Sequence, residues 1–403
     1  MKAYRLLILM LVVASCSSEE DTTSRQDASK LSEPKIIETV RHESGKLTAY
    51  NFEYPSTDPF GKPTMLTGTI VVGDEVTASK LARGLMLYNH FTVYQADQCP
   101  SRGYLDGEKL VAGSGLITIS ADYYGFGITE SEQQAYCIAR ANAQASVDAL
   151  LAAKKLIPTL GLEWDDDVLF NIGYSQGGQT AIGVVRLIDE QYPKLRITCT
   201  IAGGGSYDIP ETYRQMIASN VTGMPSTVVS VLLAYNEYFS LGFSRGQIFK
   251  EPLLSHIDEW IISKWYTREQ IDNKIGSQTI SDWATPEIID QTSSLSQRLM
   301  SALEQDNLCK GWTPRSDEHI MIVHHSKDIT VPVANANNLY HFLKEERGLK
   351  NVSLISDDWG FIGGQPAHET GAYYFSLTAL TEVCTTLRIW PWINLSLLWG
   401  LSD

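Results

Sequence analysis

The chain has 403 residues, of which 43% are hydrophobic and 20% are charged, so it carries enough apolar side chains to bury a sizeable core. Its formal net charge is −15, and no basic cluster occurs along it. These two features argue against a nucleic-acid partner, because an acidic chain gains little from contact with phosphate groups.

The first residues have the pattern of a secretory signal. Two basic residues precede an apolar run at residues 6–13, which is too short to span a bilayer comfortably. The sequence Val-Ala-Ser-Cys at residues 13–16 resembles the lipobox of bacterial lipoproteins, in which the cysteine is lipidated and becomes the mature N-terminus. We therefore predict a signal peptide at residues 1–15 and a lipid anchor on Cys16 that holds the protein at a membrane. A plain signal peptide that is cut elsewhere is the alternative.

Residues 17–34 have almost no apolar content, which is typical of a flexible tether. Together with Cys16 they form the predicted segment 16–34. The Ser-Ser-Glu-Glu-Asp stretch after Cys16 resembles the surface-export signal of lipoproteins from Bacteroidetes-type bacteria. We expect an exported lipoprotein of the cell envelope, anchored in the outer membrane and exposed at the cell surface.

The folded part alternates apolar strands with helical spacing. This pattern predicts an α/β fold with a mostly parallel central sheet that helices cover on both faces. The predicted strands up to residue 205 lie at residues 47–53, 65–72, 84–88, 115–120, 167–172 and 196–201. Helices are predicted at 138–156 and from the end of the glycine-rich stretch at 173–178 to about 190.

The alternation stops at residue 206 and resumes at residue 313. Residues 206–312 show helical segments and polar turns, which predicts a helical cap inserted between core segments 35–205 and 313–403. The apolar stretch at 226–243 fits equally well a lid over an acyl pocket or a helix packed on the main domain. Beyond the cap we expect strands at 320–324 and 352–355, a helix at 333–346, and an apolar tail with three Trp at 388–401.

Five cysteines remain besides Cys16, and export would permit disulfides between them. Cys99 lies in a polar loop and Cys137 begins a helical stretch, and we expect these two to form a bridge. Cys199 lies in an apolar strand and is expected to be a buried thiol. The spacing of Cys and His residues matches no zinc-binding motif.

The strongest chemical signal is Gly173-x-Ser175-x-Gly177, which directly follows a predicted strand and directly precedes a helix. In that context the turn lifts a serine oxygen out of the sheet, and the glycines avoid collisions with neighbouring backbone. The helix that follows points amide hydrogens and the positive end of its dipole at the reacting centre. We predict that Ser175 is a nucleophile, with a structural strand–turn–helix as the alternative.

A serine hydroxyl needs a base to take its proton, and the expected chain order is Ser, then acid, then His. His368 lies in a polar loop beyond the last predicted strand and before another helical run, where this fold would place the base. Capping of that helix is its alternative role. Five other histidines follow Ser175 and are less suitable as the base: His256, His319, His324, His325 and His341.

The acid is expected at Asp328, which follows the strand at 320–324 and precedes Val331-Pro332 and a helix. A carboxylate at that place would orient the imidazole and stabilise its protonated form. Asp208, Asp357 and Asp358 also follow predicted strands and are the rival candidates. Loop aspartates commonly form turns instead.

Two amide donors should stabilise the oxyanion. One is the backbone N–H of Gln176, the residue after the nucleophile, and the other should come from the loop after the strand at 84–88. In that loop we favour Phe91 over His90 and Thr92.

Across residues 45–380 the chain resembles the α/β-hydrolase superfamily. The sequence Gly-Tyr-Ser-Gln-Gly-Gly at 173–178, Asp-Tyr-Tyr-Gly-Phe-Gly at 122–127, the long cap and Trp312-x-Pro314 are most similar to its secretory lipase and lysophospholipase-like branch. The resemblance implies a triad of Ser175, Asp328 and His368, acyl-enzyme chemistry and no cofactor or metal. The chain departs from the usual His-Gly oxyanion motif, because residues 89–91 are Asn-His-Phe, and this leaves the second donor open.

The leading functional hypothesis is an esterase or lipase that acts on a small-molecule ester. A serine peptidase on the same fold is one alternative, and a non-catalytic surface lipoprotein that binds glycans or lipids is another. Intact Ser, Asp and His in the expected order argue against the second alternative.

Overall fold

The computed structural model describes residues 31–41, 46–103 and 114–389. The predicted signal peptide, Cys16 and nearly all of the tether and apolar tail lie outside these residues. Within the described residues, no helix is both long enough and apolar enough to cross a membrane.

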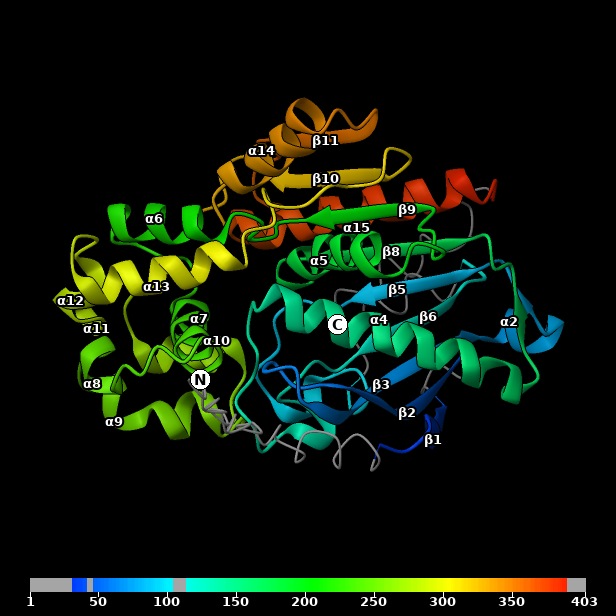
Figure 1. The fold of residues 1–403 in the computed structure, drawn as a ribbon, viewed down its shortest axis with the longest axis horizontal. Helices are drawn as coiled ribbons and strands as arrows, with labels where there is room; N and C mark the ends of the chain where they lie inside the picture. Colours follow the sequence, from blue (N-terminus) through cyan, green and yellow to red (C-terminus); the bar gives the residue numbers. More distant parts are fainter. Residues whose placement is uncertain (1–30, 42–45, 104–113, 390–403) are drawn as a thin grey trace, which may run out of the picture.

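A nine-stranded sheet forms the centre of the molecule, in the order β1-β2-β3-β6-β5-β8-β9-β10-β11 (Figure 1). The pairs from β1 to β6 are antiparallel, and every pair from β6 through β11 is parallel. This arrangement confirms the predicted α/β-hydrolase fold with a mostly parallel sheet. The strands are β1 (Lys35–Arg41), β2 (Leu47–Thr57), β3 (Pro63–Gly73), β5 (Leu85–Asn89), β6 (Ile117–Ala121), β8 (Leu169–Tyr174), β9 (Cys199–Gly203), β10 (His319–His325) and β11 (Asn351–Asp357). A separate pair consists of β4 (Leu81–Ala82) and β7 (Glu163–Trp164).

The central strands are buried on both faces, which explains why their sequences are continuous apolar runs. Alternate residues of β5 point to opposite faces. Leu85 and Leu87 join the apolar cluster that includes residues of α4 (Ala139–Leu156) and α5 (Gln176–Gln191). Met86 and Tyr88 join the cluster that includes residues of α15 (Ala367–Thr386). Figure 1 shows α4 and α5 in front of the sheet and α15 behind it.

Smaller helices complete the core domain. Helix α2 (Asp74–Ser79) follows β3, and α14 (Ala334–His341) continues into a π-helical turn, Phe342–Glu346, before β11.

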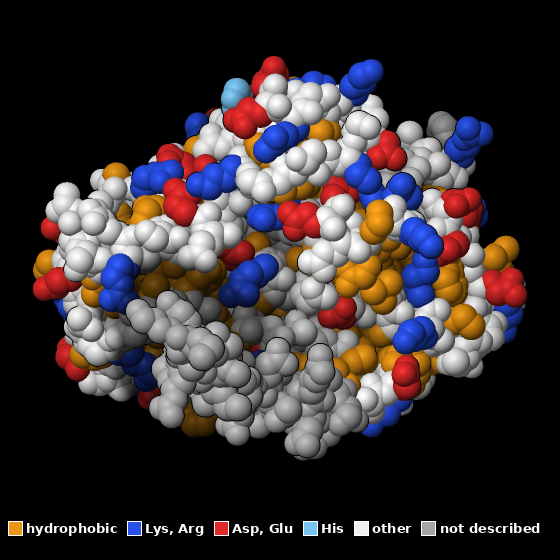
Figure 2. Space-filling view, viewed as in Figure 1, with side chains coloured by type: hydrophobic (Ala, Val, Ile, Leu, Met, Phe, Trp, Pro, Cys, Tyr) orange, Lys and Arg blue, Asp and Glu red, His pale blue; other side chains and the backbone are white. Residues whose placement is uncertain are grey.

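On the face drawn in Figure 2, acidic and basic side chains are interspersed, so the negative charge of the chain is not gathered into one patch on that face.

Between β9 and β10 the chain leaves the sheet and forms a group of helices beside the carboxyl ends of the parallel strands (Figure 1). These helices bury a second apolar cluster, which includes Val229, Tyr235 and Leu299 and also residues of the segment before α4. The helices are α6 (Ile209–Ser219), α7 (Pro225–Tyr238), α8 (Arg245–Ile248), α9 (Leu253–Ile257), α10 (Arg268–Ile275), α11 (Ile280–Trp283), α12 (Pro286–Ile289) and α13 (Ser294–Gln305), with a π-helical turn at Asp258–Ile262.

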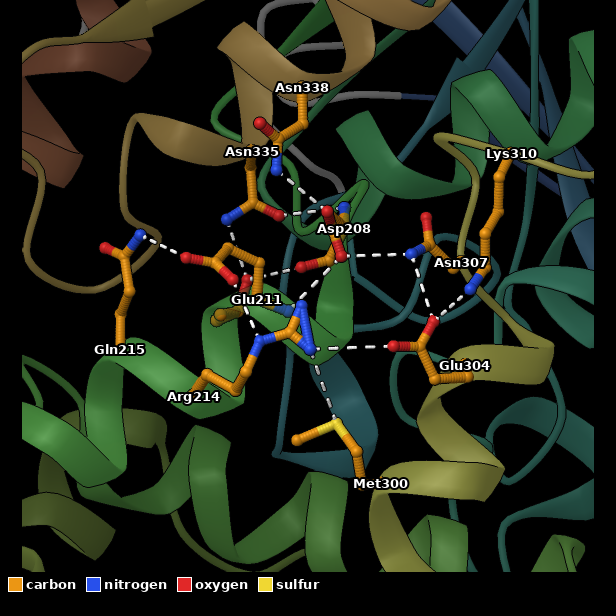
Figure 3. Close-up of polar contacts among 11 residues, drawn as sticks. Asp208, Glu211, Arg214, Gln215, Met300, Glu304, Asn307, Lys310, Asn335 and Asn338 are labelled. Atoms are coloured by element: carbon orange, nitrogen blue, oxygen red, sulfur yellow. Dashed lines mark hydrogen bonds and ion pairs between the residues drawn. The ribbon is translucent and has the colours of Figure 1, made fainter. Parts of the chain in front are cut away.

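Polar side chains hold the two ends of this helical segment against the core (Figure 3). Asp208 caps α6 by accepting a hydrogen bond from Glu211 N at 3.2 Å. The same carboxylate accepts hydrogen bonds from the side-chain amides of Asn307, at 3.0 Å, and Asn338, at 2.8 Å. The Asp208 amide donates to Asn335 Oδ1 at 2.9 Å. Asp208 therefore joins the start of α6, the chain after α13 and helix α14.

The expected disulfide between Cys99 and Cys137 is wrong, since both are free thiols. They belong to different apolar surroundings: Cys99 packs with Val93 and Phe126, whereas Cys137 belongs to the cluster of the inserted helices. The Sγ of Cys99 lies 3.3 Å from the backbone oxygen of Ala96. Cys199 is a fully buried free thiol, which confirms the expectation for it.

Candidate active site

Ser175 lies at a sharp bend between β8 and α5 and has the backbone angles φ 57° and ψ −120°. Few non-glycine residues adopt this conformation, which is typical of a strained strand-to-helix turn. A Cβ on Gly173 would lie 2.2 Å from the carbonyl oxygen of Gly177. One on Gly177 would lie 2.0 Å from the carbonyl oxygen of Asn89. Both glycines are therefore required by close approach of backbone to backbone.

His368 connects Ser175 to Asp328. Its Nε2 lies 2.9 Å from Ser175 Oγ, and its Nδ1 lies 2.5 Å from Asp328 Oδ2. The three side chains come from the turn after β8, the loop after β10 and the first turn of α15. The Tyr174 hydroxyl donates to the backbone oxygen of His368 at 2.6 Å and thereby fixes the start of α15 above the turn.

The Asp328 carboxylate is buried and receives further hydrogen bonds. Its Oδ1 accepts from the amides of Thr330, at 2.8 Å, and Val331, at 2.9 Å. Burial by itself would raise the pKa of Asp328, but the His368 imidazole and these hydrogen bonds outweigh burial, so the pKa lies below its usual value. Burial would likewise lower the pKa of His368, but the Asp328 charge outweighs it and the pKa is raised. The pair thus favours an ionised carboxylate that stabilises a protonated imidazole.

The rival histidines after Ser175 make other contacts. His324 is fully buried, with Nε2 2.8 Å from the Val331 carbonyl and 3.6 Å from Asp328 Oδ2. His325 Nε2 lies 3.0 Å from the Gly360 carbonyl, and the His256 ring stacks on Trp260. His341 lies 3.7 Å from Glu346.

The rival aspartates also have other partners. Asp208 takes part in the polar contacts of Figure 3, and Asp358 pairs with Lys327 at 2.5 Å. Asp357 accepts a hydrogen bond from the amide of Asp358. Of the aspartates in the described part of the chain, Asp328 is the one that contacts the His368 imidazole.

The two expected amide donors belong to segments that border Ser175. Gln176 is the first residue of α5, so its N–H has no acceptor within the helix. The end of β5 and the loop after it lie against the turn, because the carbonyl groups of Asn89 and His90 are the nearest atoms to an added Cβ on Gly177.

His90 holds this loop in place. Its ring is fully buried, stacks on Tyr123 at a centroid distance of 4.1 Å and places Nδ1 2.7 Å from the carbonyl oxygen of Phe91. Burial lowers the pKa of His90 to about 4, so the ring is neutral at physiological pH. Phe91 itself is partly exposed.

An apolar cleft opens beside Ser175 and Gln176. Its walls come mainly from α6 and α7, and they are completed by Tyr136, Cys137 and the loop after Asp328. Sequence reasoning singled out α7 and missed α6 and Tyr136, whose places at the cleft depend on contacts between distant segments. Apolar lining residues include Ile209, Tyr213, Met216, Met224, Val228, Val231 and Leu232.

Helix α7 both lines the cleft and packs inside the molecule. Val228 and Val231 line the cleft, while Val229 and Tyr235 pack inside the apolar cluster of the inserted helices. The Tyr235 hydroxyl also donates to the Cys137 carbonyl at 3.1 Å, which links the helix to the segment before α4.

The model of the secretory lipase family matches residues 110–359, which is more than half of the chain. The chain belongs to the secretory lipase family. This membership confirms the resemblance that its motifs indicated, and it supports carboxylic ester hydrolysis and export from the cell. A search of curated proteins found no match.

Several solved structures are similar in fold to this chain. A protein from Legionella pneumophila has a TM-score of 0.75 and 20% sequence identity, covering 89% of this chain and 98% of its own. The rice cell wall degrading esterase LipA from Xanthomonas oryzae has a TM-score of 0.71 and 18% identity, covering 88% and 96%. Candida antarctica lipase A in its closed state has a TM-score of 0.61 and 15% identity, covering 89% and 82%. At these identities the similarity shows a shared fold.

Proposed function

We propose that this secretory lipase family member is a serine esterase in which Ser175 attacks the ester carbonyl and forms an acyl-enzyme. The observation that carries the proposal is the continuous contact from Ser175 Oγ through both ring nitrogens of His368 to Asp328. In this arrangement His368 accepts the hydroxyl proton during attack and returns it to the leaving alcohol. A water molecule then attacks the acyl-enzyme, and His368 accepts its proton. The bond between the acyl group and Ser175 Oγ breaks, the carboxylic acid leaves, and His368 returns the proton to Ser175. Asp328 orients the imidazole throughout.

The two expected amides complete the reaction centre. As the carbonyl becomes tetrahedral, its oxygen gains negative charge, and the N–H groups of Gln176 and Phe91 are proposed to donate to it. The free N-terminal amides and dipole of α5 add a favourable field at the same point. Removal of one such donor typically costs about 3 kcal/mol of transition-state stabilisation.

The apolar cleft supports an ester substrate with an apolar acyl group. The cleft opens beside Ser175 and is lined by side chains from α6 and α7. An acyl chain bound in it would place its carbonyl at the nucleophile. Burial of each methylene contributes about 0.8 kcal/mol, which favours acyl chains of several carbons over acetyl. In this proposal residues 206–312 form a cap that completes the binding site of a core made of residues 35–205 and 313–403.

We also propose that the enzyme is a lipoprotein. The sequence at residues 13–16 supports cleavage before Cys16, with residues 16–34 acting as a tether between the lipid and the core. The enzyme would then act at the cell envelope, anchored in the outer membrane and exposed at the surface. Mass spectrometry of the mature N-terminus tests this: a diacylated or triacylated Cys16 is expected, and an unmodified terminus at another residue would refute it.

Kinetics on a panel of p-nitrophenyl esters of increasing acyl length test the proposed activity. Wild type should hydrolyse the panel and react with a fluorophosphonate probe, and Ser175→Ala should do neither. Ser376→Ala, which alters a serine on α15 that bonds the Ala372 carbonyl, is the matched control and should retain both properties. Faster cleavage of aminoacyl anilides than of esters would instead indicate a peptidase. Absence of labelling in a folded wild-type protein would indicate a binding scaffold.

A further inference from the structure

A second cluster of reactive side chains lies at the opposite end of β9 from the proposed active site. The carbonyl of Gly203, at the end of β9, accepts a hydrogen bond from the Ser175 amide, whereas β9 begins at Cys199. Cys199 is fully buried, and neither it nor its neighbours take part in the proposed reaction. Its surroundings therefore need an explanation of their own.

Strand register places His319 beside Cys199. Ile320 pairs with Thr200 and Met321 with Ile201 in the parallel ladder of β10 and β9, so the residues one step earlier are His319 and Cys199. Because side chains alternate along a strand, both project to the face on which Ile201 packs, and this is the face that α15 covers.

Helix α15 contributes the third group. Figure 1 shows α15 running along β9 and β10, and Val383 of this helix belongs to the same apolar cluster as Cys199. The preceding residue, Glu382, is half-buried and turns its carboxylate toward the two strands, since one of its oxygens lies near both other groups. Its Oε1 also accepts a hydrogen bond from the Thr386 hydroxyl at 3.1 Å.

The donor atoms of the three side chains lie within 4.8 Å of one another: Cys199 Sγ, an imidazole nitrogen of His319 and a carboxylate oxygen of Glu382. Zinc binds these atom types at about 2.3 Å for sulfur and about 2.0–2.2 Å for nitrogen and oxygen. At these bond lengths, the ligand atoms of a tetrahedral zinc lie about 3.4–3.6 Å apart. Side chains whose donor atoms lie within 4.8 Å of one another would therefore have to draw together by up to roughly 1.4 Å to hold an ion. Within the described residues, the His319 imidazole forms no hydrogen bond or ion pair.

We propose that Cys199, His319 and Glu382 form a zinc site, with water as the fourth ligand. The mixture of one thiolate, one imidazole and one carboxylate suits Zn²⁺, which accepts all three ligand types in tetrahedral geometry. Binding displaces the thiol proton, which leaves as H⁺ when the Zn–S bond forms. The site does not depend on the proposed ester hydrolysis.

The zinc ion would fasten three elements that are far apart in the chain. It would join the starts of β9 and β10 to the last turns of α15, the helix whose first turn carries His368. Because the ligands are brought together only in the folded state, zinc binding should stabilise that state. The site is a structural clamp on α15, remote from the reacting groups.

Metal titration of the purified full chain tests the proposal, with Zn²⁺ alone and Co²⁺ alone as probes. Wild type should bind one equivalent of Zn²⁺, and Zn²⁺ should raise the melting temperature by about 3 °C. Bound Co²⁺ should show a thiolate charge-transfer band in the near ultraviolet and the visible spectrum of a tetrahedral ion.

Ligand variants decide whether these three residues hold the metal. Cys199→Ser, His319→Gln and Glu382→Gln should each weaken Zn²⁺ affinity by more than about tenfold and abolish the thermal shift. Cys384→Ser, which changes a buried thiol on α15 that is not a proposed ligand, should bind Zn²⁺ as wild type does. Glu382→Gln preserves size at a half-buried position, and it decides the matter if the other variants fail to fold.

Any of three results would overturn the proposal. The first is the absence of stoichiometric binding by folded wild type. The second is an affinity that is unchanged in the ligand variants, and the third is a Co²⁺ spectrum without the thiolate band. If folded wild type shows no esterase activity, the proposed function is refuted but the zinc site is not. Failure of the proposed function and failure of the zinc proposal are therefore distinguishable.

Discussion

The core and the inserted helices contribute to the cleft in different ways. The core supplies Ser175, Asp328 and His368, each at or just beyond the end of a strand or at the start of a helix that packs on the sheet. The inserted helices supply apolar side chains from α6 and α7 that form the cleft wall. In the proposed enzyme the reacting atoms thus sit on elements of the sheet domain, while the surface proposed to contact the acyl group comes from helices that pack in a second apolar cluster. Substitutions in the core should therefore change the rate of chemistry, and substitutions in the cleft wall should change the choice of substrate.

Ser175→Ala gives the largest expected effect. Loss of the nucleophile should reduce kcat by about 10⁶-fold, leaving the residual rate that binding and the oxyanion donors provide. Steady-state kinetics on the best ester of the panel measure this. A loss below tenfold, with Ser376→Ala as the comparison, would contradict the assignment of Ser175.

Asp328→Asn should reduce kcat by about 10⁴-fold, because an amide neither holds the imidazole tautomer nor stabilises its protonated form. Asp357→Asn is the matched control at the end of β11, where the carboxylate is exposed, and it should keep nearly full activity. A larger loss of kcat in Asp357→Asn than in Asp328→Asn would mean that Asp357, and not Asp328, is the acid that supports His368. The same kinetic assay, together with circular dichroism to confirm folding, measures both variants.

The pH dependence of kcat/KM tests the electrostatics of the core. His368 must be neutral to accept a proton, and its pKa is raised above the ordinary value of 6.5 by Asp328. The rate should therefore be full at high pH and fall about tenfold per unit as pH drops below the pKa of His368. In Asp328→Asn the acid limb should move to lower pH because the stabilising charge is absent. A wild-type limb centred below 6.5 would contradict this account.

Val231→Phe tests whether the cleft wall selects the acyl group of the substrate. Val231 is half-buried on α7 and lines the cleft, so a larger ring should shorten the space available to an acyl chain. We expect kcat/KM for long-chain esters to fall about tenfold relative to acetate esters, while the acetate rate stays near wild type. Val221→Phe, at an exposed valine outside the cleft, should leave this ratio unchanged. Equal losses on all chain lengths would mean that α7 affects the chemistry itself.

Asn338→Ala gives the smallest expected effect and tests the polar contacts that join the core to the inserted helices. It removes the 2.8 Å hydrogen bond from Asn338 to Asp208 and should lower the free energy of unfolding by about 1 kcal/mol. Chemical denaturation measures the change, with Asn337→Ala, at the exposed neighbouring position, as the control. If both variants are equally stable, the contacts drawn in Figure 3 contribute little to holding the inserted helices.

Local sequence pattern was sufficient for most strands of the central sheet, for the main helices of the core and for the turn at Ser175. The helix expected at 138–156 is observed at Ala139–Leu156, and the strand expected at 84–88 is Leu85–Asn89. These features depend on neighbours in the chain: apolar runs for strands that are buried on both faces, and glycines where backbone meets backbone around Ser175. The first strand, Lys35–Arg41, was not expected, because its side chains are mostly exposed and it pairs along an edge.

Sequence by itself determined the fold class, the family and the order of Ser175, Asp328 and His368, because each rests on a short motif or on periodicity along one segment. Tertiary structure alone decided that Cys99 and Cys137 are separate thiols, that α6 and Tyr136 line the cleft, and that Cys199 lies beside His319 and Glu382. The physical reason is that these contacts join segments distant in the chain. Strand register and helix packing set such distances, and no spacing in the sequence records them.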